Sequence, residues 1–167
     1  MAPKPNLHLR TTRLIELAMT RTAKVLLVDI DPDDYVITRD FLSEAEGIRY
    51  DLHWEPTYPG ALREIASESY DACLVDYGLG AFEGLDLVRE LKRIHANLPV
   101  ILLTGRIDDR IMTEGIEAGA AAYIVKGEVS AQSLDRVIQH AIQSANDGEP
   151  RSVVKSSGSE MENSLCN

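Results

Sequence analysis

The chain has 167 residues, which is enough for one compact domain with tails, because domains commonly contain roughly 100–200 residues. Its 17 basic and 27 acidic side chains give a formal net charge of −10, so we expect the phosphates of nucleic acids to repel it. Its apolar runs are far shorter than the roughly 20 residues of a membrane-spanning helix, and its first residues lack a signal-peptide core. Two cysteines cannot form a disulfide framework. We therefore predict a cytoplasmic protein that binds neither nucleic acid nor membrane.

Three segments of the chain differ in pattern. Residues 1–22 contain one partly amphipathic stretch, and we expect an N-terminal arm or short helix there. Residues 23–146 alternate short apolar runs with amphipathic stretches and are expected to form the folded domain. Residues 147–167 lose this rhythm, contain Ser-Ser-Gly-Ser and scattered charges, and are predicted to form a disordered C-terminal tail.

Within the folded segment, five expected strands are each followed by a helix. The strands are predicted at residues 25–28, 48–54, 72–75, 100–103 and 122–125. The helices are predicted near residues 33–45, 59–67, 85–95 and 108–118, with a fifth after the cap residue Ser130. The first helix is expected to begin after the cap residue Asp31 and to bury Ile37 and Phe41. The buried face of the last helix is predicted to comprise Leu134, Val137, Ile138, Ala141 and Ile142.

Strands that are continuously apolar and alternate with amphipathic helices are typical of a doubly wound α/β fold. Such a fold has a parallel sheet with helices on both faces, because both faces of each strand are buried. Right-handed crossovers leave few arrangements for five strands. We expect a five-stranded sheet with the flavodoxin-like strand order 2-1-3-4-5, whose functional groups gather at the carboxyl ends of the strands.

Four polar residues stand where predicted strands end: Asp29, Asp76, Thr104 and Lys126. If they meet at one edge of the sheet, two carboxylates are available for a divalent cation, and one of them for attack on phosphorus. The hydroxyl and the ammonium group suit phosphoryl oxygens. Taken singly, three of these residues have plainer interpretations: Asp29 and Thr104 as turn residues, and Lys126 as a solvent-exposed strand end. Nearby Asp31 is more simply a helix cap.

The segment from about residue 23 to residue 144 resembles the receiver domain of two-component response regulators. The matching stretches are residues 25–32, residues 70–79 with Gly84-Leu85, residues 99–105 and residues 118–126. The resemblance implies that Asp76 is the phosphoacceptor, that Thr104 and Lys126 contact the phosphoryl group, and that Tyr123 is the aromatic switch residue. It also implies a Mg²⁺ ion held by Asp29, Asp76 and the main-chain carbonyl of Gly78.

The sequence departs from the family pattern at two positions. The family has two adjacent acids after the first strand, whereas here Asp29 is followed by Ile30. We expect this change to weaken Mg²⁺ binding, with Asp31 as a further candidate ligand. Lys126 is followed by Gly127 where the family commonly has proline, so we expect a looser approach of the lysine to the phosphoryl group.

The resemblance implies a response regulator that takes a phosphoryl group on Asp76 from a histidine kinase or a phosphotransfer domain. Its only catalysis would be its own phosphorylation and dephosphorylation at that aspartate. Because the sequence shows no second domain, we expect the output to be protein contact, with a downstream partner or in a homodimer formed through the fourth and fifth helices.

Two alternatives stay open. Ile30 is compatible with an atypical receiver that acts as an interaction module without phosphorylation. Asp29 and Asp31 also form the Asp-x-Asp pattern of haloacid-dehalogenase-like phosphatases. Against the phosphatase, Asp31 leads straight into a helix without room for an inserted flap, and Asp76 is left without a role.

Overall fold

The computed structural model describes residues 20–148 and 154–156. The predicted N-terminal arm therefore lies outside the described residues up to residue 19, and Arg21 and Thr22 already belong to the first strand. Most of the predicted C-terminal tail also lies outside the described residues. Of that tail, the structure describes the end of the last helix, Gly148 and one short strand, Val154–Ser156.

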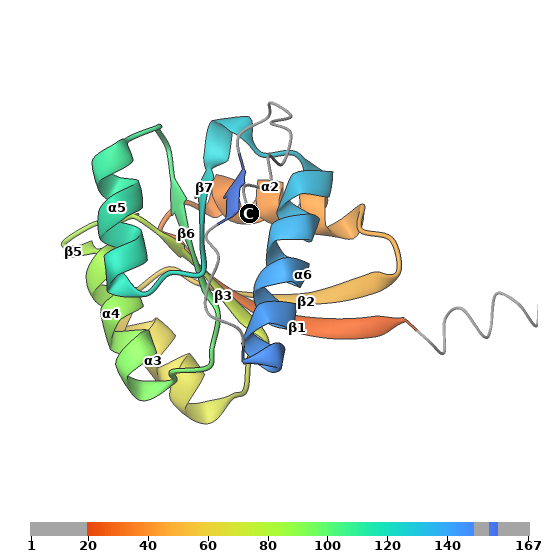
Figure 1. Cartoon of the computed structure of the whole chain (residues 1–167), viewed down its shortest axis with the longest axis horizontal. Coiled ribbons are helices and arrows are strands. Elements are labelled where there is room, and N and C mark those ends of the chain that lie inside the picture. Colours follow the sequence, from red (N-terminus) through yellow and green to blue (C-terminus); the bar gives the residue numbers. More distant parts are fainter. Residues whose placement is uncertain (1–19, 149–153, 157–167) are drawn as a thin grey trace, which may run out of the picture.

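The first five strands of the main sheet alternate with helices along the chain, and a short two-stranded hairpin follows the third of them (Figure 1). The strands are β1 (Arg21–Val28), β2 (Ile48–Glu55), β3 (Ala72–Asp76), β4 (Gly78–Leu79), β5 (Phe82–Glu83), β6 (Val100–Thr104), β7 (Ala122–Val125) and β8 (Val154–Ser156). The helices are α2 (Pro32–Ser43), α3 (Tyr58–Ser67), α4 (Gly84–Ile94), α5 (Asp109–Ala118) and α6 (Ala131–Asp147), with a 3₁₀ turn, η1 (Lys126–Glu128), between β7 and α6.

The main sheet is parallel throughout and has the strand order β2-β1-β3-β6-β7-β8. Its first five strands follow the predicted order, so the predicted doubly wound fold is confirmed. The sixth strand was not predicted: β8 pairs with β7 in a register that sets Val154 beside Ala122. A separate two-stranded hairpin, β4 and β5, follows β3.

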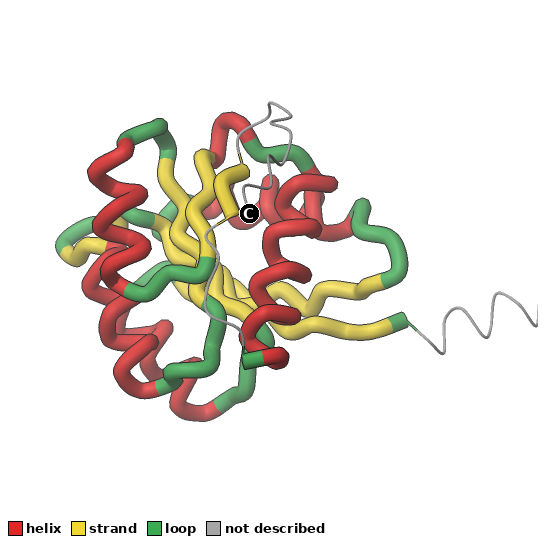
Figure 2. The backbone as a smooth tube through the Cα atoms, viewed as in Figure 1, coloured by secondary structure: helices red, strands yellow, loops and turns green. Residues whose placement is uncertain are grey.

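Helices cover both faces of the sheet. Figure 1 and Figure 2 show α3, α4 and α5 together on one side and α2 and α6 on the other. Alternate residues of β1 serve the two cores, because successive strand side chains point to opposite faces: Leu26 and Val28 pack with α3, α4 and α5, whereas Val25 and Leu27 pack with α2 and α6. The predicted buried face of α6 is confirmed at all five positions.

The predicted buried face of α2 is wrong by one residue. Ile37 is 49% exposed and Phe41 is only partly buried, whereas Thr38 and Leu42 are buried. Apolar residues lie on more than one side of this helix, so its periodicity does not fix its rotation. With this rotation Asp34, which stands four residues before the buried Thr38, lies on the same inward-facing side of the helix.

Central strands and edge strands of the sheet differ in burial. The central strand β3 lies between β1 and β6, and all of its residues are buried. The edge strand β2 has exposed residues interspersed along its length, as a strand with one open side should. Among the described helices, none has the length and apolar character needed to cross a bilayer.

Candidate functional site

Three of the residues predicted to meet at the carboxyl edge of the sheet are in direct contact. The ammonium nitrogen Nζ of Lys126 lies 2.6 Å from Oδ2 of Asp29 and 2.7 Å from Oδ1 of Asp76. These residues follow β1, end β3 and follow β7, so three strands deliver them to one place. Thr104 ends β6 and lines the same cleft as Asp76 and Lys126. The four predicted positions are thus brought together.

Asp29 is almost fully buried, with 1% of its surface exposed. Its Oδ1 accepts a 2.9 Å hydrogen bond from the main-chain N–H of Asp31, which fixes the carboxylate just beyond the end of β1. Burial raises the pKa of Asp29 above its ordinary 3.8, and the hydrogen bond from Lys126 opposes this rise only in part. The charge of this carboxylate therefore depends on the neighbouring ammonium group.

Asp76 closes the central strand and is held from two sides. Its Oδ2 accepts a 2.8 Å hydrogen bond from the main-chain N–H of Gly78, and its Oδ1 faces Lys126. The start of α4 packs directly against its main chain: a Cβ atom on Gly84 would lie 2.1 Å from the carbonyl oxygen of Asp76. Glycine is needed at position 84 for this close approach, which fixes the place of the carboxylate.

The ammonium group of Lys126 has a third carboxylate partner that the sequence analysis did not identify. Oδ2 of Asp34, in the first turn of α2, lies 2.6 Å from Nζ. Burial lowers the pKa of Lys126, but hydrogen bonds with Asp29, Asp34 and Asp76 and the charge of Asp76 raise it, and the net result lies above the ordinary 10.5. Although Gly127 replaces the expected proline, the ammonium group is held at three points.

Asp31, the further candidate ligand, is a helix cap in this structure. Its Oδ1 accepts a 2.9 Å hydrogen bond from the main-chain N–H of Asp33 and so caps α2. The acid of this segment that enters the cluster is Asp34. In the sequence, Asp34 is marked only by its spacing of four residues from Thr38, which places the two on one side of the helix. That spacing points to the cluster only once the structure has shown that Thr38 is buried.

A second hydrogen-bonded group connects the cleft with α5. The hydroxyl of Thr104 donates to the carbonyl oxygen of Arg106 at 3.3 Å, and the hydroxyl of Tyr123 donates to the same oxygen at 3.0 Å. The Tyr123 oxygen also lies 3.4 Å from the main-chain nitrogen of Asp108, which donates to it, and Asp108 caps α5. Thr104 and Tyr123 are both buried. The loop between β6 and α5 is thus held by Thr104, the predicted phosphoryl contact, and by Tyr123, the predicted switch residue.

The donor groups fit the chemistry of Mg²⁺. This ion prefers oxygen ligands, usually one or two carboxylates, and keeps several waters. Asp29 and Asp76 are two carboxylates at one site, and the main-chain carbonyl of Gly78 belongs to the loop that lines it. Within residues 20–148 and 154–156, no three Asp, Glu, His or Cys side chains are arranged as a metal site, so the carboxylates of Asp29, Asp34 and Asp76 surround the ammonium group of Lys126 and do not form a ready-made three-residue metal site. Ile30, half exposed, supplies no oxygen ligand beside Asp29.

An aromatic pair supports the site from the edge strand. The indole N–H of Trp54, near the end of β2, donates a 2.7 Å hydrogen bond to the main-chain carbonyl of Asp29. The ring of Tyr35 on α2 stacks on the indole, with ring centroids 5.3 Å apart and planes inclined by 15°. The sequence alone indicates only that Trp54 ends an edge strand, because a hydrogen bond to a main-chain atom 25 residues away leaves no local pattern.

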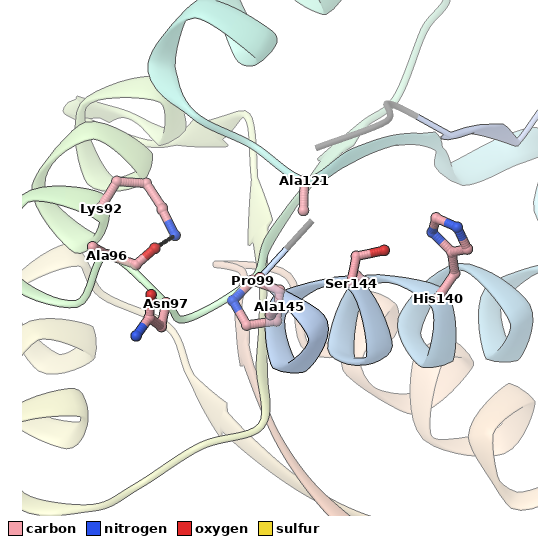
Figure 3. Close-up of a pocket in the computed structure, with 10 residues that line it drawn as sticks. Lys92, Ala96, Asn97, Pro99, Ala121, His140, Ser144 and Ala145 are labelled. Carbon is pink, nitrogen blue, oxygen red and sulfur yellow. Dashed lines mark hydrogen bonds between the residues drawn. The ribbon is translucent and has the colours of Figure 1, made fainter. Parts of the chain in front are cut away.

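A different pocket lies at the amino-terminal ends of the strands, opposite the carboxyl ends that hold Asp76 (Figure 3). Its lining includes Pro99 and Ala121, which immediately precede β6 and β7, together with His140 and Ser144 of α6. The ammonium group of Lys92 at its rim donates to the carbonyl oxygens of the neighbouring loop rather than into the pocket. This pocket lacks the convergent carboxylates of the cleft around Asp76.

Comparison with known proteins agrees with this geometry. The sequence profile of the response regulator receiver domain matches residues 25–139. The two-component response regulator PhoP of Pseudomonas aeruginosa is 37% identical over 71 residues, which are 42% of this chain and 32% of that protein. The transcriptional regulatory protein YdfI of Bacillus subtilis is 31% identical over 124 residues, covering 72% of this chain and 55% of that protein. The chain thus matches about a third to a little over half of the length of these relatives.

Solved structures show the same fold. A CheY-like receiver domain protein from Methanospirillum hungatei superposes with a TM-score of 0.68 at 23% identity, covering 77% of this chain and 99% of that one. The signal receiver domain of an HD domain-containing protein from Pseudomonas fluorescens gives a TM-score of 0.69 at 25% identity, with coverage of 77% and 93%. This chain belongs to the response regulator receiver domain family of two-component systems.

Proposed function

We propose that this receiver accepts a phosphoryl group on Asp76 from the phosphohistidine of a histidine kinase or a phosphotransfer protein, in the cytoplasm. The observation that carries the proposal is the placement of the Asp76 carboxylate in an open cleft with Lys126 and Thr104 on its walls. A carboxylate oxygen attacks phosphorus, the bond between phosphorus and the histidine nitrogen breaks, and the imidazole keeps the electron pair. The product is an aspartyl phosphate.

The surrounding residues supply what this transfer needs. Mg²⁺, when bound by Asp29, Asp76 and the Gly78 carbonyl, would neutralise negative charge on the transferring group. Lys126 contributes a positive charge beside Oδ1 of Asp76. Thr104 contributes a hydroxyl at the end of the adjacent strand β6. Preorganised donors of this kind stabilise charge that develops on phosphoryl oxygens.

The output is a change in protein contact. The Thr104 hydroxyl leaves the Arg106 carbonyl for a phosphoryl oxygen, and Tyr123, which shares that carbonyl, changes its hydrogen bonding with the loop before α5. The face formed by α5 and α6 then presents a different surface to a downstream protein or to a second copy of the chain. Such a switch acts only because the partner binds the two states with different affinity.

Labelling with acetyl phosphate tests this function directly. Intact-mass measurement in the presence of Mg²⁺ is expected to show one added phosphoryl group on the wild-type chain and none on Asp76→Asn. Asp33→Asn is the matched control, because it removes the same charge from an exposed residue of the first turn of α2 that is not a partner of Lys126, and it is expected to be labelled. Chelation of Mg²⁺ should suppress labelling of all variants. Labelling of Asp76→Asn at the wild-type level would contradict the assignment of the acceptor.

A second candidate function is a phosphorylation-independent interaction module, and the exposed Ile30 favours it. In that case the fold and the face of α5 and α6 still serve a partner, but no phosphoryl transfer takes place. The same measurement separates the two functions. A wild-type chain that stays unmodified under conditions that label an ordinary receiver supports the interaction module and contradicts the phosphoacceptor role of Asp76.

A further inference from the structure

The ammonium group of Lys126 is surrounded by three carboxylates. A lysine ammonium carries three N–H donors. Its Nζ donates hydrogen bonds of 2.6 Å to Asp29 Oδ2 and of 2.6 Å to Asp34 Oδ2, and it forms an ion pair with Asp76 Oδ1 at 2.7 Å. Any further anion that binds this lysine must therefore compete with the three carboxylates that already surround it.

Asp34 differs from the other two carboxylates in origin and exposure. Asp29 is nearly inaccessible and is fixed by the Asp31 N–H, and Asp76 is itself the proposed acceptor. Asp34 comes from the first turn of a helix rather than from a strand end, and 28% of its side chain is exposed. It also lines the cleft that Asp76 and Thr104 share, so its charge faces the space that a phosphoryl donor enters.

We infer that Asp34 restrains phosphorylation of Asp76 by holding Lys126 within the unmodified carboxylate cluster and by adding negative charge to the mouth of the cleft. The inference rests on the proposed function and names the residue that regulates it. Asp34 is a positioning residue, because it acts through Lys126. Both of its effects act in one direction: a competing partner for the ammonium group and a repelling charge for an anionic donor each slow the transfer.

The rate of labelling by acetyl phosphate in saturating Mg²⁺ tests this inference. Asp34→Asn is expected to be labelled about two- to fivefold faster than the wild type, the range that corresponds to loss of one partly exposed ion pair. Asp33→Asn is the matched control, because it removes an equal charge from the same helical turn but its exposed carboxylate is not one of the three around Lys126. Its rate should stay near the wild-type rate. Asp34→Glu retains the charge and should stay slow.

A second readout does not require phosphorylation. Hydrogen exchange of the Lys126 ammonium group, followed by ¹⁵N NMR on the unmodified protein, is expected to be faster in Asp34→Asn and unchanged in Asp33→Asn. Unchanged exchange in Asp34→Asn would show that the lysine is not held by this contact and would overturn the inference.

Failure of the restraint by Asp34 and failure of the proposed function give different results. If the wild type is labelled normally and Asp34→Asn is labelled no faster, or more slowly, the restraint is wrong and the proposed function stands. If neither the wild type nor any variant is labelled, the proposed function is wrong and the restraint falls with it.

Discussion

The indole N–H of Trp54 is hydrogen-bonded to the main-chain carbonyl of Asp29, at 2.7 Å. This bond ties the edge strand β2 to the acidic end of β1, and the stacked ring of Tyr35 extends the contact to α2. The Asp29 N–H also donates to the carbonyl oxygen of Glu55, at 3.3 Å. The main chain that presents Asp29 to Lys126 is therefore held by the end of β2 through both of its polar groups.

Replacement of Trp54 by phenylalanine is expected to keep the aromatic contact with Tyr35 and to remove the hydrogen bond. The free energy of unfolding should fall by about 1 kcal/mol, because the Asp29 carbonyl loses a partner in a partly buried place. Urea unfolding followed by circular dichroism measures the change. Tyr35→Phe, which preserves the stacked ring, should leave stability nearly unchanged. Equal effects of the two substitutions would show that the hydrogen bond contributes nothing.

Replacement of Ile30 by aspartate is expected to strengthen Mg²⁺ binding about three- to tenfold, because a second carboxylate then stands beside Asp29. The side chain of Ile30 is 50% exposed, so the fold should tolerate the change. Trp54 is the only tryptophan of the chain and is bonded to Asp29, so its fluorescence is a suitable reporter in a Mg²⁺ titration. Ile30→Asn controls for the loss of the apolar side chain. A binding constant unchanged by Ile30→Asp would mean that another acid already supplies this ligand.

Replacement of Gly84 by alanine is expected to destabilise the domain by about 2 kcal/mol or more, because the new methyl group overlaps the main chain of Asp76. Thermal unfolding and the labelling rate should both be affected, since α4 must move away from Asp76. Gly105→Ala is the control at the same edge of the sheet: no atom lies within 4 Å of its added Cβ, and its φ is not positive. Similar losses from both substitutions would contradict a specific role for the close approach.

The alkaline stability of the domain should depend on Lys126. Because the folded-state pKa of Lys126 lies above 10.5, its charge stabilises the fold fully below that pH, and this contribution is lost as the pH rises through the folded-state pKa. Raised pKa values of Tyr50 and Tyr70 act in the same direction. The useful quantity is therefore the difference in unfolding free energy between the wild type and Lys126→Gln. This difference should be constant near neutral pH and should become smaller above pH 10.5. A difference that grows above pH 10.5 would contradict a stabilising charge on Lys126 in the carboxylate cluster.

The strand order and the convergence of the site follow from strong patterns in the sequence. Runs such as residues 100–103 are apolar at every position, which marks strands buried on both faces, and each is followed by an amphipathic helix. A sheet of this type brings its strand ends together, so Asp29, Asp76, Thr104 and Lys126 could be placed at one edge without coordinates.

The rotation of α2 could not be read in this way. Val36 and Ile37 are apolar but exposed, and the position that is buried between them and Leu42 is occupied by Thr38. A pattern with apolar residues on several sides fits more than one rotation, and the wrong choice conceals Asp34. The short strand β8 is hidden for another reason: it joins the sheet through main-chain pairing with β7, which a polar tail does not reveal by composition.

Asp76, the proposed phosphoacceptor, ends the central strand β3. This strand is paired on both sides and buried along its whole length, so its neighbours restrain the main chain at Asp76. If Asp76 is phosphorylated as proposed, we expect the structural response in the more exposed loop from Gly105 to Asp108 and in the turn that begins at Lys126. The proposed signal would then be carried by the rim of the molecule rather than by the centre of its sheet.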